Sequence, residues 1–315
     1  MSLTWRQDWT EHKVRGGASG QRFDVPVSLY PSRDAMRRSI ATAIAFAVFA
    51  LLSLPVTVQA WGNGGFSDDP SHPDYGIHDW IADKALSFQT SNVQFLLTTY
   101  HADYLIGTEA PDNGAYIGDS YNHHVYFGSS GEIQSDVAAT RARSMYQSAL
   151  VFIRQSDFEK AAYYAGAMAH YISDLGAYGH TMGNRTVWGT SPHHEGYEDH
   201  VQTMLGTLVA PPPSALIWTD AYNSTLALAR ETTFGSGAIK TNTWMESNYD
   251  WSDSAFRASC LESLNESVRA VARVLGQLLL EGGIALVPEF EFPGAVIVLT
   301  LAIPIGVACR RHQEE

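Results

Sequence analysis

Apolar residues recur at intervals of three and four along several stretches of the chain, which is typical of amphipathic helices. This pattern predicts helices over residues 136–155, 157–175, 214–232 and 253–281, and a shorter one in GIHDWIADKALSF, residues 76–88. The apolar positions of the last long helix are Phe256, Cys260, Leu264, Val268, Val271, Leu275 and Leu278. Strand alternation of useful length and internal repeats are not found in the sequence. We therefore expect an all-α fold.

The first 60 residues are not expected to belong to that fold. An apolar run over residues 40–55 follows Met36-Arg37-Arg38 and precedes the small-residue site Val58-Gln59-Ala60, as in a secretory signal peptide cleaved after Ala60. The run of about 16 residues is shorter than the roughly 20 that a spanning helix needs. Because residues 1–35 lie upstream of a complete signal, we expect Met36 to be the true start.

The composition changes again at Pro288. An apolar run over residues 292–308 ends at Arg310-Arg311. A core helix is one interpretation, but the prolines and the terminal basic pair favour a membrane tail. Pro288-Glu289-Phe290 before a short hydrophobic segment resembles the PEF type of archaeal sorting signal. That resemblance implies an archaeosortase-like processing enzyme as a partner and an exported protein retained at the cell surface.

The segment between these ends, residues 61–287, is long enough for one domain with a sizeable core. Residues 61–315 hold 13 Lys and Arg against 29 Asp and Glu, a formal charge of −16. Without a basic stripe, such a chain is not expected to bind nucleic acid through its backbone phosphates. Its two cysteines, Cys260 and Cys309, offer no disulfide framework. We therefore expect metal binding, together with the helical core, to supply the free energy that keeps the protein folded outside the cell.

Residues 165–200 carry the candidate chemistry. On a helix, His170 and Asp174 share a face, and so do His194 and Glu198, with His180 on the connection between the two helices. For a single histidine, a satisfied core residue would be the better interpretation. Here the neighbouring residues are apolar, and several imidazoles and carboxylates buried together imply a cation. Nitrogen and oxygen ligands with nothing softer suit zinc.

These residues also carry a family resemblance. HYISD, then His180 six residues after Asp174, then HHEGYE with His194 fourteen residues after His180, resembles the bacterial zinc-dependent phospholipase C family and the related S1/P1-type nucleases. Glu198 favours the phospholipase branch, because the nucleases usually have Asp there. The family commonly has Gln-Pro before the loop histidine, where this chain reads Ala177-Tyr178-Gly179. The resemblance implies a single multi-helix domain with a metal cluster between helices.

The same resemblance implies roles for residues outside the two-helix cluster. Cleavage after Ala60 would expose Trp61, and the family's N-terminal Trp binds zinc through its α-amino nitrogen and carbonyl oxygen. His78 corresponds to the histidine that shares this metal. Asp112 corresponds to the carboxylate that orients or deprotonates the attacking water. The pattern His-x-Tyr aligns best with His124 as a ligand and leaves His123 as its neighbour.

In the family pattern these ligands divide among up to three zinc ions. One ion is held by His124, His170 and Asp174, one by His180, His194 and Glu198, and one by Trp61 and His78 with Asp174 bridging. Close metal ions of this kind hydrolyse phosphodiesters. We therefore expect a phospholipase C-like hydrolase acting on a phospholipid or a related phosphodiester. The alternatives are a nuclease of the S1/P1 type, which needs aromatic platforms for bases, and a metal-stabilised surface protein without turnover.

Overall fold

The structure is a computed structural model in which the described residues are 75–112, 117–119 and 121–284. They all belong to one compact unit, Val58–Glu315. The predicted signal peptide, the predicted N-terminal ligand Trp61 and the predicted tail from Pro288 onward lie outside the described residues.

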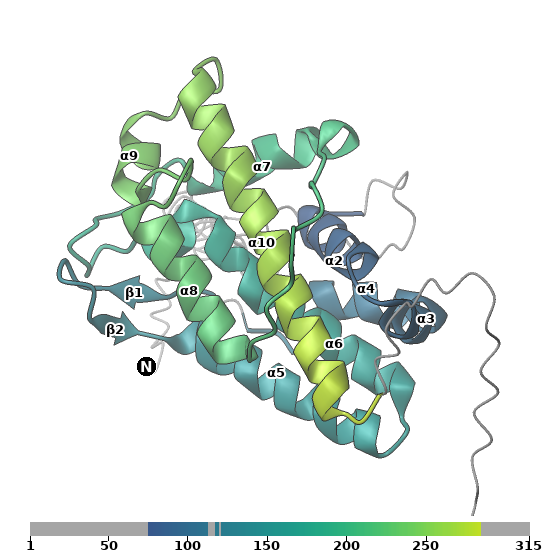
Figure 1. Cartoon of the computed structure of the whole chain (residues 1–315). Coiled ribbons are helices and arrows are strands. Elements are labelled where there is room, and N and C mark those ends of the chain that lie inside the picture. Colours follow the sequence, from purple (N-terminus) through teal and green to yellow (C-terminus); the bar gives the residue numbers. More distant parts are fainter. Residues whose placement is uncertain (1–74, 113–116, 120, 285–315) are drawn as a thin grey trace, which may run out of the picture. The chain divides into compact units, whose positions relative to one another are not determined.

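The described elements are helices and one short hairpin, arranged as Figure 1 shows. In chain order they are α2 (Ile77–Ser87), α3 (Ser91–Thr99), α4 (His101–Glu109), β1 (Tyr126–Phe127), β2 (Ile133–Ser135), α5 (Val137–Arg154), α6 (Phe158–Ser173), η1 (Asp174–Gly176), η2 (Tyr178–Thr181), α7 (His194–Thr203), η3 (Leu205–Thr207), α8 (Ala221–Phe234), α9 (Asn242–Ser247) and α10 (Ser254–Glu281). The all-α fold class is confirmed.

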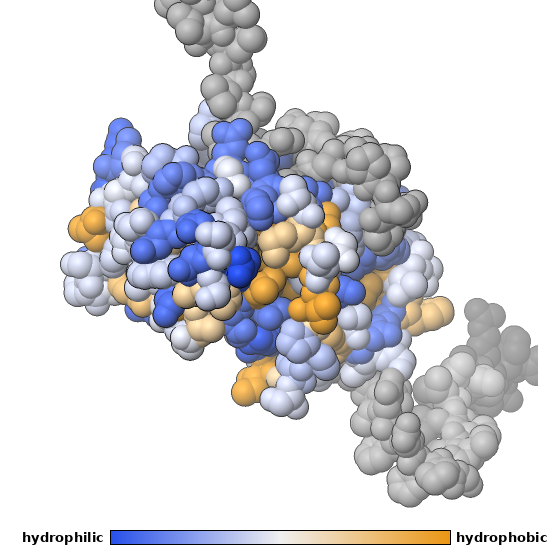
Figure 2. Space-filling view, turned by 90° about the horizontal axis from the view of Figure 1, so that it is seen from above, coloured by the Kyte–Doolittle hydropathy of each residue, from blue (hydrophilic) through white to orange (hydrophobic). Residues whose placement is uncertain are grey.

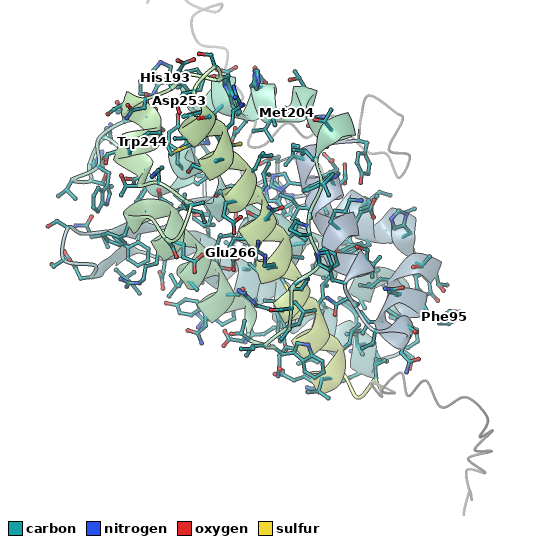
Figure 3. All side chains as sticks on the ribbon, turned by 45° about the horizontal axis from the view of Figure 1, so that its top comes forward. Phe95, His193, Met204, Trp244, Asp253 and Glu266 are labelled. Carbon is teal, nitrogen blue, oxygen red and sulfur yellow. The ribbon has the colours of Figure 1, made fainter. Side chains whose placement is uncertain are left out.

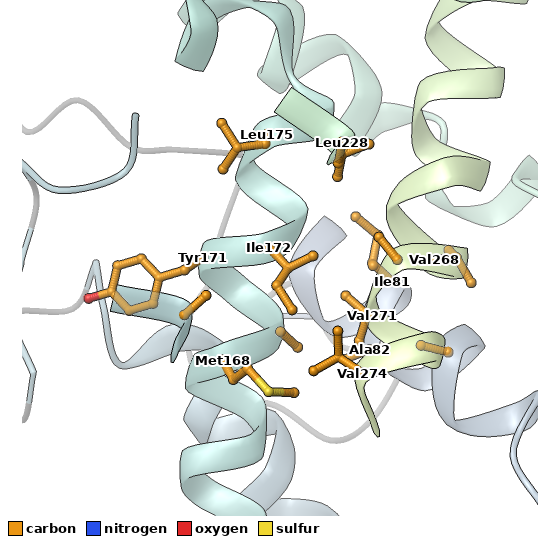
Figure 4. Packing of buried hydrophobic residues seen from close by; sticks show 14 of the residues in the cluster. Ile81, Ala82, Met168, Tyr171, Ile172, Leu175, Leu228, Val268, Val271 and Val274 are labelled. Carbon is orange, nitrogen blue, oxygen red and sulfur yellow. The ribbon is translucent and has the colours of Figure 1, made fainter. Parts of the chain in front are cut away.

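Helix α6 is the central element of the core. Its sequence is rich in alanine, most of its residues are buried, and it contacts α2, α4, α5, α8 and α10. In Figure 4, Ile172 points toward Val271 and Val274 of α10, whereas Tyr171 points to the other side of α6. Both sides of α6 are thus used for packing, and the candidate ligands His170 and Asp174 lie at its C-terminal end.

Two glycines allow α4 to lie directly against α6. A Cβ atom on Gly166 would lie 1.9 Å from the Tyr104 carbonyl oxygen, and one on Gly107 would lie 2.0 Å from the Tyr163 carbonyl oxygen. Real contacts to a Cβ are essentially never shorter than 3.0 Å, so a larger residue at either position would push the helices apart. This close contact brings the end of α4 beside the last turn of α6.

Most predicted helices are confirmed, with one clear error. Helices α5 and α10 match the predicted ranges within one residue at each end, and α6 is followed at once by η1. The helix predicted from Ser214 instead begins at Ala221. There the Asp220 carboxylate accepts a hydrogen bond from the Asn223 amide (3.0 Å) and caps the helix. Residues 208–220 upstream form no described helix or strand.

The hairpin β1–β2 was not expected from the sequence. Its strands pair antiparallel, with Tyr126 opposite Ser135 and Phe127 opposite Ile133. Strands of two and three residues are too short to show an alternating pattern. The Trp188 indole donates to the Phe127 carbonyl oxygen (2.7 Å) and ties the hairpin to the loop before α7.

Figure 2 shows one face of the molecule, on which hydrophilic residues are mixed with hydrophobic ones and an apolar area lies near the middle. Cys260 is buried and has a free thiol, whereas Cys309 lies outside the described residues. None of the described helices combines the length and apolar composition needed to cross a bilayer.

Candidate metal centre

The predicted ligands come from separate elements and meet in three groups of buried or half-buried side chains, two of which share His170. Within each group the candidate donor atoms lie within 4.8 Å of one another. The groups are His78, His170 and Asp174; Asp112, His123 and His170; and His180, His194 and Glu198. Every predicted ligand among the described residues takes part except His124.

Two of the histidines have an orientation that suits metal binding. The Ser173 hydroxyl donates to the His170 carbonyl oxygen (3.0 Å) and therefore accepts from Nδ1 of His78 (2.7 Å). Nδ1 of His170 donates to the Thr108 carbonyl oxygen (2.6 Å). In both rings the proton is on Nδ1, so the lone pair of Nε2 faces the cluster. Metal-binding histidines typically have this kind of outer hydrogen bond.

Asp174 is the common neighbour of these groups. Its Oδ1 lies 3.3 Å from Nε2 of His78 and 3.8 Å from Nε2 of His180. Its Oδ2 lies 2.7 Å from Nδ1 of His123 and 3.4 Å from Nε2 of His170. Burial alone would raise the pKa of Asp174, but the surrounding histidines, first His170, hold it well below its usual range. A fully buried carboxylate surrounded on both oxygens can serve two neighbouring cations.

The group on α7 follows the predicted i, i+4 geometry. Oε1 of Glu198 lies 2.7 Å from Nε2 of His194, one turn earlier on the helix, and 3.2 Å from Nε2 of His180 on η2. Burial opposes ionisation of Glu198, yet His194 and His180 lower its pKa to about 2. The carboxylate is therefore the acceptor that this pair of imidazoles faces.

The preference for His124 over His123 does not match the geometry. His123 is buried, with Nδ1 next to Asp174 and Nε2 3.5 Å from Oδ1 of Asp112. The His124 ring instead stacks on Tyr126 (5.5 Å between centroids), and its Nδ1 donates to the His180 carbonyl oxygen (3.2 Å). The His124 ring also lies 5.0 Å from the ring of His180, so both histidines lie near the candidate ligands, but only His123 belongs to one of the three groups.

Asp112 lies closer to the candidate ligands than a residue acting only on water requires. Its Oδ1 is 3.7 Å from Nε2 of His170 as well as 3.5 Å from His123. Burial raises the pKa of Asp112 to about 7, although His123 acts in the opposite direction. The position is compatible with the predicted base and also with a ligand.

The donor atoms fit a metal ion. Nε2 of His78, Nε2 of His123, Oδ1 of Asp174 and Oε2 of Glu198 are buried and make no hydrogen bond within the described structure. Buried polar atoms are normally hydrogen-bonded, and an exception calls for an explanation such as a bound ion. Imidazole nitrogens and carboxylate oxygens around a shared space are the ligands that zinc takes.

Gly179 contributes to the site although the sequence did not single it out as a site residue. A Cβ atom on it would lie 2.3 Å from Cγ and Cδ2 of His194. The missing side chain lets the His194 ring lie against the backbone of η2, next to His180. Ser173 and Thr108 were also not predicted. Their hydrogen bonds to His78 and His170 depend on contacts between helices, for which a sequence has no spacing signal.

Solved structures with this fold include two clostridial toxins. The alpha-toxin from Clostridium absonum superposes with a TM-score of 0.50 at 17% identity, covering 69% of this chain and 65% of that protein. An alpha-toxin of Clostridium perfringens from an avian strain gives 0.52 at 17% identity, covering 70% and 66%. The matched region thus spans just under two thirds of the toxins' length. At this identity the likeness establishes the fold alone.

Sequence comparisons add no closer relative. No protein-family profile matches the chain, and no curated protein matches its sequence. The mostly helical fold agrees with the all-α class predicted from the sequence.

Proposed function

We propose that this protein is a zinc-dependent phosphodiester hydrolase of the phospholipase C-like type. The observation that carries the proposal is the convergence of three groups of buried imidazole and carboxylate donors, in the order of the family's motifs, within the fold of the alpha-toxins. A lone buried histidine would have an ordinary structural explanation. Three such groups side by side, in which Nε2 of His78, Nε2 of His123, Oδ1 of Asp174 and Oε2 of Glu198 are buried without a hydrogen bond, call for a different explanation.

The proposed ligand set follows the family pattern with one replacement, His123 for His124. One ion is assigned to His123, His170 and Asp174, a second to His180, His194 and Glu198, and a third to Trp61 and His78 with Asp174 shared. Zinc bound there would supply Lewis acidity that stabilises the phosphoryl oxygens and lowers the pKa of a water molecule. The assignment of Trp61 as a ligand rests on the sequence alone, because this residue lies outside the described residues.

The protein's own part in the reaction falls on Asp112. In the hydrolysis, an oxygen of water bonds to phosphorus, the ester oxygen on the glycerol side leaves, and one proton of the water ends on that oxygen. Asp112 is a carboxylate beside the candidate ligands, and the family pattern assigns to it the role of accepting this proton. The remaining buried residues exclude solvent and keep the ligands oriented through Thr108 and Ser173.

An activity panel tests the proposal. The purified, zinc-loaded protein is assayed on phosphatidylcholine, a small phosphodiester and single-stranded DNA, each with and without a chelator. We expect chelator-sensitive release of the phosphomonoester from the lipid. Cleavage of DNA alone would favour the S1/P1-type nuclease, and absence of any turnover in a zinc-loaded protein would favour a metal-stabilised surface protein.

A matched variant tests the role of Asp112. Asp112→Asn keeps the shape of the side chain but removes the proton acceptor, so we expect the zinc content to persist and turnover to fall by about 100-fold or more, the range that general-base catalysis supplies. Loss of zinc together with turnover would make Asp112 a ligand.

Export and surface retention are also part of the proposal. They rest on residues 1–60 and on the segment from Pro288 onward, together with the implied archaeosortase-like enzyme. A chain ending at Gly283 should be released from the cells in soluble form with its zinc, because every proposed ligand precedes Val201. Retention of this shortened chain at the surface would contradict the sorting signal.

A further inference from the structure

The short helix α9 contacts the candidate site from outside. Asn242 and Glu246 lie four residues apart on α9 and so share one of its faces. Asn242 is fully buried, and its Nδ2 donates to the carbonyl oxygen (3.3 Å) and to Oγ1 (3.2 Å) of Thr181. Thr181 directly follows His180. The first residue of the pair therefore holds the backbone on the C-terminal side of a proposed ligand.

Glu246 contacts the Tyr178 side chain on the other side of the same ligand and also reaches the residue before the next ligand. Its Oε2 accepts from the Tyr178 hydroxyl (3.1 Å), two residues before His180, and from the amide of His193 (3.4 Å). Its Oε1 pairs with Nδ1 of His193, which directly precedes His194. One carboxylate, with 12% of its side-chain surface exposed, thus joins η2 to the first turn of α7.

The segment after α9 adds contacts along α7. The His193 ring stacks on Tyr249 with 4.4 Å between centroids, and the His200 ring stacks on Trp251 at 3.9 Å. In the view of Figure 3, His193 and Asp253, the residue before α10, are both labelled in the upper part of the molecule. Helix α7 itself buries only Tyr197, Glu198 and Val201. Contacts outside the hydrophobic core therefore add to the few buried residues that hold α7 in position.

We infer that Asn242 and Glu246 are positioning residues for the metal group of His180, His194 and Glu198. This inference rests on the proposed function, because it assigns a role toward a bound metal. The two histidines lie on different elements, so helix geometry alone does not set the distance between them, and the core contact of Tyr178 with Tyr197 (5.0 Å between centroids) is one constraint on it. Metal–ligand distances are expected to hold to within about 0.2 Å. The polar contacts of α9 add a second constraint on the same two elements.

The test compares zinc binding by the full chain and its variants. Glu246→Ala removes all three contacts, whereas Glu246→Gln keeps an acceptor for Tyr178 and His193. Asn242→Ala removes the contacts to Thr181. Asp199→Asn is the control, because Asp199 is an exposed carboxylate on α7, the helix that carries His194 and Glu198. Zinc affinities come from competition with a chromophoric chelator, and the geometry of the site comes from the visible absorption of the cobalt-substituted protein.

We expect Glu246→Ala and Asn242→Ala to weaken the binding of one zinc ion by about 10-fold, the lower end of the range for loss of a hydrogen bond to a metal ligand, because these bonds go to the neighbours of the ligands. The other ions should keep their affinity, the cobalt spectrum should lose one component, and Glu246→Gln should restore part of the loss. Asp199→Asn should match the unaltered chain.

Two results would overturn the inference. Unchanged zinc affinity in both alanine variants would mean that α9 does not position the ligands, and an equal loss at every zinc ion would mean a general folding role. If the unaltered chain binds no zinc, the proposed function itself fails and the inference falls with it. These outcomes are distinguishable because the unaltered chain is measured first.

Discussion

Substitution of Gly179 by alanine should remove one zinc ion without unfolding the protein. A Cβ at this position would lie 2.3 Å from two carbon atoms of the His194 ring and 2.7 Å from its Nδ1. Carbon atoms in contact are normally about 3.5–4.0 Å apart. The ring or the backbone of η2 must therefore move by roughly 1.2 Å, the difference between about 3.5 Å and the 2.3 Å contact.

That displacement is several times what a zinc site accepts, since ligand distances hold to within about 0.2 Å. The overpacking itself is expected to lower the free energy of unfolding of the metal-free protein by about 1–3 kcal/mol. Gly179 does not have a positive φ, so the effect comes from the contact with His194 and not from backbone strain.

Gly206→Ala provides the matched control, because a Cβ there meets nothing within 4 Å and its φ is not positive. Zinc per chain is measured by elemental analysis after dialysis, and stability by thermal unfolding of the metal-free protein. Gly179→Ala should hold about one zinc fewer than the unaltered chain and Gly206→Ala the same number. If Gly179→Ala keeps its full zinc content and affinity, His194 is not a ligand in the observed orientation.

The remaining predictions concern the other proposed ligands. His123→Ala should lose zinc whereas His124→Ala should keep it, which elemental analysis of the pair decides; the reverse result would restore the alignment with His124. Asp174→Ala should lose more zinc than Glu198→Ala, because its two oxygens face different histidines, and equal losses would contradict a shared carboxylate. A domain that keeps one extra residue before Trp61 should bind about one zinc fewer by the same analysis, because an amide nitrogen cannot replace a neutral amine as a donor; identical zinc content would remove the N-terminal ligand.

Periodicity and spacing determined much of this protein without a structure. Helices α5 and α10 follow directly from apolar residues at intervals of three and four. The i, i+4 pairs of α6 and α7 share a face because helix geometry is local and repeats every 3.6 residues. Where a contact lies within one turn of a helix, the sequence alone is sufficient to predict it.

Contacts between elements were decided by the tertiary structure. The sequence offered both His123 and His124 as ligands, and only the tertiary structure brings His123 into one of the three groups. The contact of Gly179 with His194 and the bonds from Glu246 to η2 and α7 join residues distant along the chain. No local period encodes such pairs, since they depend on how whole helices pack. The sequence therefore determined which residues can bind a metal, and packing determined which of them meet.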